Sequence, residues 1–367
     1  MERKDNPHKE VNHSPGAIAW RRFRSNPLAM SGLVFIVLIM LVAIAGPFIR
    51  PDDTINANNQ SLLISRQKPG FTIQEVRIAK YEPQHGFFET WMNGGSPKEY
   101  TSLRADSVVI LDDKLIAYST QGTMRTDTLL LQTLLKSSDG SYSFTRTFWL
   151  GTDKYGRDLL SRLMAGAMIS LAVGAIAVII SLLVGLTLGL IAGYYRGWVD
   201  QLIMWFTNVI WAVPTLILVM AITFAFGSGF WKVFLAVGLT MWVEVARIAR
   251  GQVLSIREKE YVEAARALGF SEFRIIFKHI LPNILSPIIV ISAANFASAI
   301  LIEAGLSFLG LGAQIPTPSW GNMIREHYAY ITTDLAYLAI VPGFMIMLLV
   351  LAFMMVGNGL RDALDVR

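Results

Sequence analysis

The stretch EYVEAARALGF, residues 260–270, is polar although it lies between two apolar runs, which raises the question of what it contacts. Residues 258–268 are rich in strong helix formers and contain no proline or glycine, which predicts a short helix. Gly269 would end that helix, because glycine adopts the left-handed conformation of a helix C-terminus at little cost. Ala264 and Ala265 are too small to anchor a helix in lipid, but they would let another protein surface approach closely.

A second short helix is predicted directly after Gly269. Ser271 can accept a backbone hydrogen bond as its N-cap, and Phe270 and Ile275 have the spacing of a hydrophobic staple. We expect Pro282 to end this helix where the chain re-enters the membrane. The predicted unit is helix, sharp turn, helix; the alternative for such a loop is an amphipathic connector lying on the bilayer surface.

Motifs for covalent or metal chemistry are absent from the sequence. It has no G-x-x-x-x-G-K-[ST] loop for ATP phosphates, no H-E-x-x-H metal motif and no G-x-S-x-G nucleophile elbow. The 5 histidines are scattered, and the chain has 0 cysteines, which excludes disulfides and cysteine-ligated metals. The sequence therefore predicts a chain that is not an enzyme, with no cofactor and no metal.

Membrane helices are the elements that must position the 260–270 stretch. The chain has 367 residues, of which 53% are hydrophobic and 16% charged, whereas soluble domains carry about 25% charged residues. A spanning helix needs about 20 mainly apolar residues. The segments that qualify are 28–48, 168–193, 203–226, 231–249, 284–302 and 336–357. We predict an all-α polytopic membrane protein with six transmembrane helices.

The first apolar segment could also be a signal peptide, because Ala43-Ile44-Ala45 resembles a cleavage site. The long preceding tail and the length of the apolar run favour an uncleaved anchor. The predicted organisation is a cytoplasmic tail at 1–27, a first transmembrane helix at 28–49, an extracytoplasmic insert at 50–150 and a core with five transmembrane helices at 151–367.

Lysines and arginines beside the spans set the expected orientation. Three arginines at 21–24 precede the first span and place the N terminus in the cytoplasm, and six crossings return the C terminus to that side. The loop 250–283 becomes cytoplasmic and carries six lysines and arginines, whereas the loop 303–335 has only Arg325. We expect a multi-pass protein of the bacterial cytoplasmic (inner) membrane. The net charge of +5 comes with no basic stripe, so no nucleic-acid partner is expected.

The segment 50–150 is too long and polar for a simple connection between spans. FTIQEVRI and SVVILDDKLIAY alternate in polarity, and SSDGSY precedes SFTRTFWL as a turn would precede a strand. We predict a small β-rich extracytoplasmic insert, with an extended segment ordered by a partner as the alternative.

Several motifs together resemble a known family. EAARALGFSEFRIIFKHILP is similar to the EAA motif of importer permeases in the ATP-binding-cassette (ABC) family, in which E-A-A is followed at fixed spacing by glycine and by Leu-Pro. The matching residues are Glu263, Ala264, Ala265, Gly269, Leu281 and Pro282. His279 departs from the pattern at a usually aliphatic position.

Three further stretches narrow the resemblance to the dipeptide, oligopeptide and nickel permease group, and within it to the second, permease C type, subunit. They are LGTDKYGRDLLSRLMAGAMISL at 150–171, GLSFLGLGAQIPTPSWGNMI at 305–324 and GNGLRDALD at 357–365. The resemblance covers 16–50 and 150–367. In that group the external loop after the first span is usually short, so the insert departs from the pattern.

The resemblance implies a type I importer that moves di- or oligopeptides, with nickel or another small solute as alternatives. Its implied partners are a second homologous permease, two cytoplasmic ATP-binding subunits and an extracytoplasmic substrate-binding protein. The ATP-binding subunits would hydrolyse ATP, and the unit at 260–280 would be the coupling helix. By the same resemblance, Glu263 makes an orienting contact, while Ala264, Ala265 and Gly269 permit close approach.

Two other classes of protein fit the sequence less well. An ion-coupled secondary transporter would contain buried ionisable relays and an inverted repeat, and neither is evident. A membrane-anchored sensor would bind a ligand with its insert, but would leave the unit at 260–280 unexplained. The sequence favours the importer permease.

Single residues along the expected pathway have two interpretations each. Glu244 forms an i, i+3 ion pair with Arg247 or lies on the pathway, and Glu303 lies on the pathway or in a solvated loop. Trp211 and Pro214 either break the third span or kink it. PTPSWGNM, at 316–323, is either a rigid cap or a docking loop.

Overall fold

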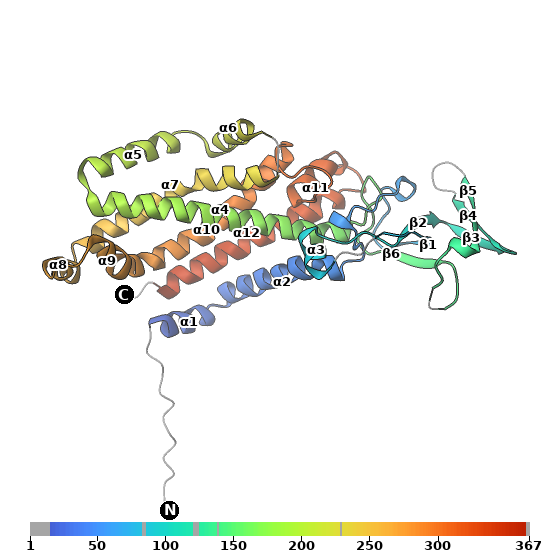
Figure 1. Cartoon of the computed structure of the whole chain (residues 1–367), viewed down its shortest axis with the longest axis horizontal. Coiled ribbons are helices and arrows are strands. Elements are labelled where there is room, and N and C mark those ends of the chain that lie inside the picture. Colours follow the sequence, from blue (N-terminus) through green and yellow to red (C-terminus); the bar gives the residue numbers. More distant parts are fainter. Residues whose placement is uncertain (1–14, 83–85, 120–124, 138, 228–229, 365–367) are drawn as a thin grey trace, which may run out of the picture.

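The computed structural model describes residues 15–82, 86–119, 125–137, 139–227 and 230–364. Long helices form a bundle, and a β-containing insert extends from one end of it (Figure 1). We call this the insert end, and the opposite end, which carries α8 (Glu260–Ala267), the α8 end. Helix α1 (Pro15–Ser25), which lies inside the predicted tail, and the last residues of α12 (Tyr337–Leu364) both lie at the α8 end.

Four helical segments among the described residues are long and apolar enough to cross a membrane. They are α2 (Pro27–Ile49), α4 (Leu159–Tyr195), the segment Glu272–Phe308, which ends with α10 (Leu281–Phe308), and α12. A fifth candidate is the pair α5 (Gly197–Trp211) and α6 (Thr215–Phe226). Helix α7 (Phe230–Arg257) has 28 residues and is not among these candidates; it carries four charged residues at 232–250.

Each predicted span overlaps a helix, and the prediction of a mainly helical protein with several apolar helices is confirmed. Among the described residues at most five candidates stand against the six predicted spans, because the predicted span 231–249 falls on α7. The third span, 203–226, differs from a single helix because it is broken, and α5 and α6 meet at 94°. Trp211 ends α5, and Pro214 is extended at φ −55° and ψ 127°. Proline disfavours a helical conformation in the residue before it, which accounts for the break.

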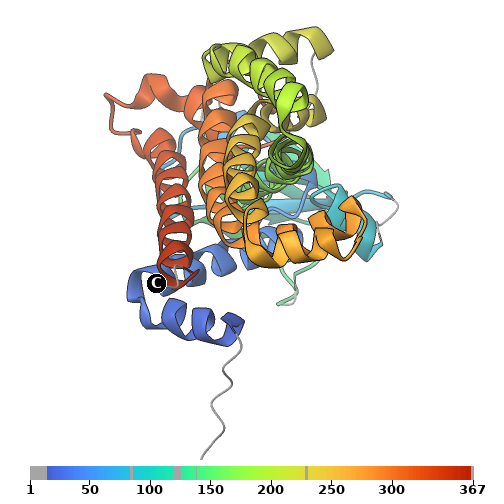
Figure 2. The same ribbon diagram turned by 90° about the vertical axis from the view of Figure 1, so that its left-hand side faces the viewer.

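Helix α4 packs along α7 through three glycines, Gly185, Gly189 and Gly193. A Cβ atom added to these residues would lie 2.5, 2.6 and 2.9 Å, respectively, from a carbonyl oxygen of α7. A Cβ atom on Gly174 would instead clash with the ring of Phe296 on α10. Small residues let membrane helices approach closely, so these glycines serve packing. Viewed from the α8 end, α10 lies between α7 and α12 (Figure 2).

The insert contains two three-stranded antiparallel sheets, which confirms the predicted β-rich character. One sheet has the order β2 (Tyr100–Ala105), β1 (Phe71–Ala79), β6 (Phe144–Phe148). The other has the order β3 (Ser107–Leu111), β4 (Lys114–Ser119), β5 (Arg125–Leu130). The short helices of the insert are η1 (Ile55–Ala57), η2 (Leu62–Ile64), α3 (Phe87–Met92) and η3 (Leu131–Thr133). Val76, Leu115 and Ala117 form the centre of its core.

A buried polar cluster joins the insert to the helices. Arg157, which is fully buried, pairs through Nε with Asp153 (2.5 Å) and through Nη2 with Glu326 (2.6 Å) on α11 (Trp320–His327). Arg162 on α4 donates to a carbonyl oxygen of η1 (3.4 Å) and to one in the loop before α11 (3.3 Å). The segment that follows the insert, the start of α4 and α11 are therefore held together by charges removed from solvent.

The loop before α11 is a packed cap. Trp320, the first residue of α11, is fully buried, and its Nε1 donates to the carbonyl oxygen of Leu163 on α4 at 2.9 Å. Ser319 accepts from the backbone N–H of Asn322 as N-cap. Of the two interpretations of PTPSWGNM, these contacts favour the rigid cap.

His327 lies beside Asp153 and Glu326 of the buried polar cluster, and its Nδ1 is 2.8 Å from the carbonyl oxygen of Met323. Ligand atoms of Asp153, Glu326 and His327 lie within 4.8 Å of one another, as a metal site would require. Arg157 already pairs with both carboxylates, so we assign the three groups to packing. Burial lowers the pKa of His327, outweighing the opposing effects of the Met323 carbonyl and the two carboxylates.

Because the pKa of His327 is lower in the folded chain than in the unfolded chain, the stability of the fold should decrease in acid. The unfolded chain binds a proton at His327 below about pH 6.5, where the folded chain resists it, so the contribution to stability is complete above that pH and declines below it. We expect the melting temperature of the purified chain to fall between pH 7.5 and 5, and the fall to be smaller in His327→Gln. Equal pH profiles for the two proteins would contradict this.

Candidate functional site

Helix α8 ends in a Schellman motif centred on Gly269, whose φ is +76°. The N–H of Gly269 donates to the carbonyl of Arg266 (3.0 Å), and the N–H of Phe270 donates to that of Ala265 (3.1 Å). Phe270 and Ala265 also belong to one apolar cluster, the contact that usually accompanies this motif. The predicted left-handed glycine at the end of this helix is confirmed.

The start of the second helix also agrees with the sequence. Ser271 accepts a hydrogen bond from the backbone N–H of Arg274 (3.4 Å) and caps α9 (Glu272–Arg274). Phe270 and Ile275 pack in the same apolar cluster, as expected for a staple. His279, the departure from the family pattern, stacks its ring on Phe270 with 6.0 Å between centroids.

The prediction that Pro282 ends the second helix is wrong. Helix α9 continues through the π-helical segment η4 (Ile275–Ile280) directly into α10, and Glu272–Phe308 forms one helical segment of 37 residues. Pro282 lies in the first turn of α10, after the wider π turn. The wide turn moves the preceding carbonyls away from the position where the proline ring would meet them. A continuous helix thus connects the turn at Gly269 to the membrane.

Two side chains anchor α8 to the bundle. Val262 is 0% exposed and Ala265 is 4% exposed. They join an apolar cluster with Tyr194 at the end of α4, Val253 of α7 and Ile275 of η4. Helix α8 is therefore packed against two long helices and the base of a third.

Polar contacts reinforce this attachment around the C-terminal end of α4. Arg196 pairs with Glu258 at 2.6 Å, and this hydrogen bond lowers the pKa of Glu258. The hydroxyl of Tyr195 donates to Glu272 at 2.8 Å, which ties α9 to the same place. Arg257 donates to the backbone carbonyl of Tyr194. Movement of α8 would therefore be transmitted to α4 and α10.

The predicted site residues divide into an exposed and a buried set. Glu263, Ala264, Gly269 and Pro282 are exposed, Leu281 is half-buried, and Ala265 is buried within the chain. No ion pair of Glu263 with Lys259 or Arg266 is found among the described residues. The sequence placed both alanines on one outward face, but Ala265 lies at its edge and packs inward.

Two large apolar side chains complete the outward surface of α8. Leu268 is 73% exposed and Tyr261 is 45% exposed, and with Ala264 they follow helical spacing. Phe273 on α9 is 71% exposed and was not among the predicted residues. Its signal in the sequence was the i, i+4 pair with Phe277, whose ring lies 4.3 Å away. We call Tyr261, Ala264 and Leu268 the docking face.

Substitution of neighbouring alanines tests this division. Ala265→Leu adds volume to a packed cluster, and such changes usually cost about 1–3 kcal/mol. Ala264→Leu adds it on the surface, where changes usually stay within about 0.5 kcal/mol. Thermal unfolding of the isolated chain should therefore separate the two variants. A similar loss of melting temperature in both would contradict the assignment of Ala264 to the surface.

In the part of the chain that the structure describes, Glu244 and Arg247 do not form the ion pair that their i, i+3 spacing suggested. Arg247 does not pair with Glu244 among the described contacts; it donates to Asn208 (2.6 Å) and its guanidinium lies over the ring of Trp211 (4.1 Å). Glu244 is exposed and lines a cavity of about 440 Å³ at the break between α5 and α6. Glu303 is 2% exposed and accepts a hydrogen bond from Ser307 (2.6 Å), so it does not lie in a solvated loop.

The sequence of this chain matches known families of transport proteins. Residues 185–367 match the family described as binding-protein-dependent transport system inner membrane component, and residues 14–69 match the N-terminal transmembrane domain of oligopeptide transport permease C. The chain is 46% identical over 217 residues to the dipeptide transport system permease protein DppC of Alkalihalophilus pseudofirmus, covering 59% of this chain and 71% of DppC. The chain belongs to this family of transport permeases.

A second relative and one solved structure also align with this chain. The permease is 43% identical over 217 residues to the glutathione transport system permease protein GsiD of Pectobacterium atrosepticum, covering 59% of this chain and 72% of GsiD. A chain of the inward-facing MetNI methionine ABC transporter aligns with 56% of it at 18% identity and a TM-score of 0.48. The permease is thus an integral membrane transport subunit of a multi-subunit transporter, and not a catalytic enzyme. Its insert strands, 71–148, lie outside both family matches.

Proposed function

We propose that this permease moves di- or oligopeptides inward across the bacterial cytoplasmic membrane and is driven by ATP-binding subunits that dock on α8. The substrate class is supported by the relatives, a dipeptide and a glutathione permease, since glutathione is itself a small peptide. The proposed assembly contains a second homologous permease, two cytoplasmic ATP-binding subunits and an extracytoplasmic substrate-binding protein. ATP hydrolysis belongs to the ATP-binding subunits.

The distribution of charge supports placing the α8 end in the cytoplasm. The arginines of α1 and the six lysines and arginines of the loop 250–283 lie at this end, and cytoplasmic loops are enriched in such residues. The insert, at the opposite end, would face the substrate-binding protein. Both chain termini would then be cytoplasmic.

One observation carries the coupling role. The docking face of α8 exposes Tyr261, Ala264 and Leu268 beyond the long helices, while Val262 and Ala265, on the adjoining side of α8, pack against the bundle. Exposed apolar side chains on a rigid element are typical of a protein interface. We propose that Glu263, beside this face, orients the partner, and that Gly269 keeps the turn compact.

Purification and uptake test the proposal. Affinity purification from native membranes should recover ATP-binding subunits with this chain, and vesicles holding the complete assembly should take up labelled alanyl-alanine only with ATP, in a vanadate-sensitive manner. Ala264→Leu, which we expect to leave the fold intact, should reduce the recovery of ATP-binding subunits. Uptake by this chain alone, driven by an ion gradient, would overturn the proposal in favour of a secondary transporter.

A further inference from the structure

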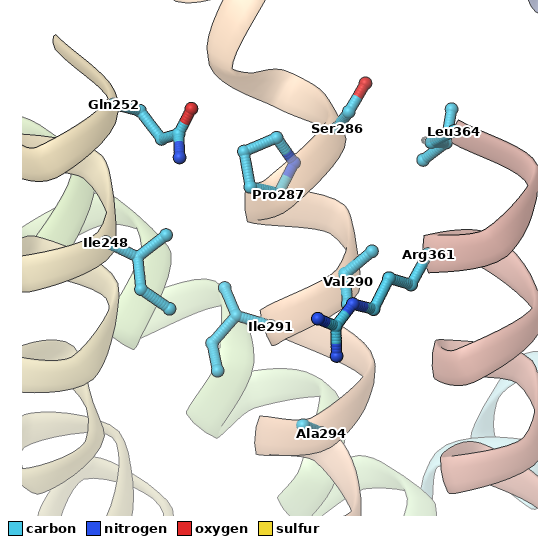
Figure 3. Close-up of a pocket in the computed structure, with 9 residues that line it drawn as sticks. All are labelled: Ile248, Gln252, Ser286, Pro287, Val290, Ile291, Ala294, Arg361 and Leu364. Carbon is cyan, nitrogen blue, oxygen red and sulfur yellow. The ribbon is translucent and has the colours of Figure 1, made fainter. Parts of the chain in front are cut away.

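A cavity of about 420 Å³ lies between α7, α10 and α12 at the α8 end (Figure 3). Its walls are mainly apolar and include Ile248, Val290 and Ile291. Gln252 of α7 and Ser286 of α10 add uncharged polar groups at its margin. The volume is in the usual range for pockets that hold small organic ligands, about 300–1,000 Å³.

Arg361 of α12 gives the cavity its single charge among the described lining residues. Its side chain extends from α12 across the cavity toward Ile291 and Ala294 (Figure 3). No described residue forms an ion pair or a hydrogen bond with its guanidinium. A guanidinium presents a planar fork of donors that matches a carboxylate in two parallel hydrogen bonds. The cavity therefore has the features of an anion site with an apolar floor.

The cavity at the α5–α6 break is lined by the same two helices, α7 and α10. On α7, Thr240 and Glu244 line the cavity at the α5–α6 break, and Ile248 and Gln252 line the cavity at Arg361. These four residues are spaced four positions apart along the helix. On α10, lining positions 287, 291, 294 and 298 follow the same helical spacing. One face of each helix therefore lines both cavities, over roughly 17 Å at 1.5 Å per residue. Polar groups recur along this track from the membrane interior to the α8 end.

A third cavity has a different lining. It lies between α4 and the start of the Glu272–Phe308 segment and is lined mainly by leucine, isoleucine and phenylalanine. The hydroxyl of Thr187 in this cavity is already donated to the carbonyl of Leu183. No lysine, arginine, aspartate or glutamate lines it. Polar and charged groups within spanning helices mark substrate routes, and only the track on α7 and α10 has them among these three cavities.

We propose that the cavity at Arg361 is a binding station for the peptide near its cytoplasmic exit, where Arg361 binds the C-terminal carboxylate. Gln252 and Ser286 are placed to hydrogen-bond the peptide backbone, and the apolar walls receive side chains without strict selection. This inference rests on the proposed function, because it supplies the peptide and the direction of transport. In this inference Arg361 binds the peptide inside the permease, after the peptide has left the external substrate-binding protein.

Cysteine protection tests the station directly, because the native chain has 0 cysteines. Val290→Cys places a thiol in the cavity at Arg361, and Leu186→Cys places a matched control thiol in the third cavity, which has no charged residue among its described lining residues. In the assembled transporter, alanyl-alanine should slow maleimide labelling at Val290→Cys but not at Leu186→Cys. The C-terminally amidated alanyl-alaninamide should give little protection, since it lacks the carboxylate.

The role of Arg361 is measured in the same background. Arg361→Ala should raise the concentration of alanyl-alanine that gives half protection by at least about tenfold, and Arg361→Lys, which retains the charge, should raise it less. Equal protection by the amide, or an unchanged value in Arg361→Ala, would overturn the inference. Protection that follows the phosphatidylglycerol content of the vesicles rather than the peptide would overturn it in favour of a lipid headgroup.

Failure of the proposed binding station can be distinguished from failure of the proposed peptide transport. If wild-type vesicles take up alanyl-alanine with ATP and the protection is absent, the station alone is rejected. If wild-type vesicles take up no alanyl-alanine, the proposed peptide transport fails, and the station fails with it. Recovery of the ATP-binding subunits with each variant shows that assembly has occurred.

Discussion

Gly269→Val is expected to reduce ATP-driven peptide uptake at least about tenfold while the protein remains inserted and folded. Gly269 has a φ of +76°, and a Cβ atom added there would meet nothing within 4 Å. The penalty is therefore conformational, about 1–2 kcal/mol for an L-residue in this region and more for a β-branched one. A penalty of this size shifts conformer populations by a factor of about 5–30. The turn would open and α8 would lose its orientation relative to α9.

Gly269→Asn is the matched control, because asparagine adopts left-handed conformations more readily than other residues with a side chain. Uptake by Gly269→Asn should stay within about threefold of wild type. Insertion of both variants can be compared by their melting temperatures and their amounts in membranes. Wild-type uptake by a correctly inserted Gly269→Val protein would reject the coupling role proposed for this turn.

Arg157→Met is expected to destabilise the junction between the insert and the helices by about 3–5 kcal/mol. The substitution removes a charge that is fully buried between Asp153 and Glu326 and leaves both carboxylates without that partner. Arg162 lies 3.9 Å from Asp153 and can compensate only in part. We expect a lower melting temperature and rapid proteolytic cleavage within 50–150, with the helical bundle cut more slowly.

A second ion pair near the same junction provides the control. Lys68 and Asp334 lie 2.9 Å apart, but their side chains are 71% and 67% exposed. Exposed pairs contribute about 0–1 kcal/mol, so Lys68→Met should have little effect on melting or on proteolysis. Comparable losses in Arg157→Met and Lys68→Met would show that burial does not govern the strength of this junction.

The buried polar cluster explains why the insert is not a loose addition to the permease. The stretch GTDKYGRDLL, which the sequence linked only to the family, supplies Asp153 and Arg157 and leads directly into α4. Its partner Glu326 is 169 residues from Arg157 along the chain. Both ends of the insert contact this cluster, because Arg162 donates to the carbonyl oxygen of Asn56 at its start and Asp153 follows its last strand.

Local sequence was sufficient where the structure depends on near neighbours. The Schellman turn at Gly269 and the cap at Ser271 involve residues at most five positions apart, and both were predicted correctly. The apolar helices followed from composition over about 20 residues. The β-rich insert followed from alternation and turn residues, which are also local signals.

Tertiary structure decided the features that depend on distant partners. Of two adjacent alanines, only Ala265 is buried, because Tyr194 and Val253 from other helices pack beside it. Pro282 failed to end a helix, because the π turn before it makes room for the ring. The open position of Arg361 depends on how α7, α10 and α12 are spaced around the cavity (Figure 3).

The sequence alone thus determined the membrane character, the helix–turn–helix unit and the family resemblance, which rest on short-range preferences and spacing. Which side chains are buried, paired or left open to a ligand was determined by long-range packing, because burial and charge pairing depend on residues far apart in the chain.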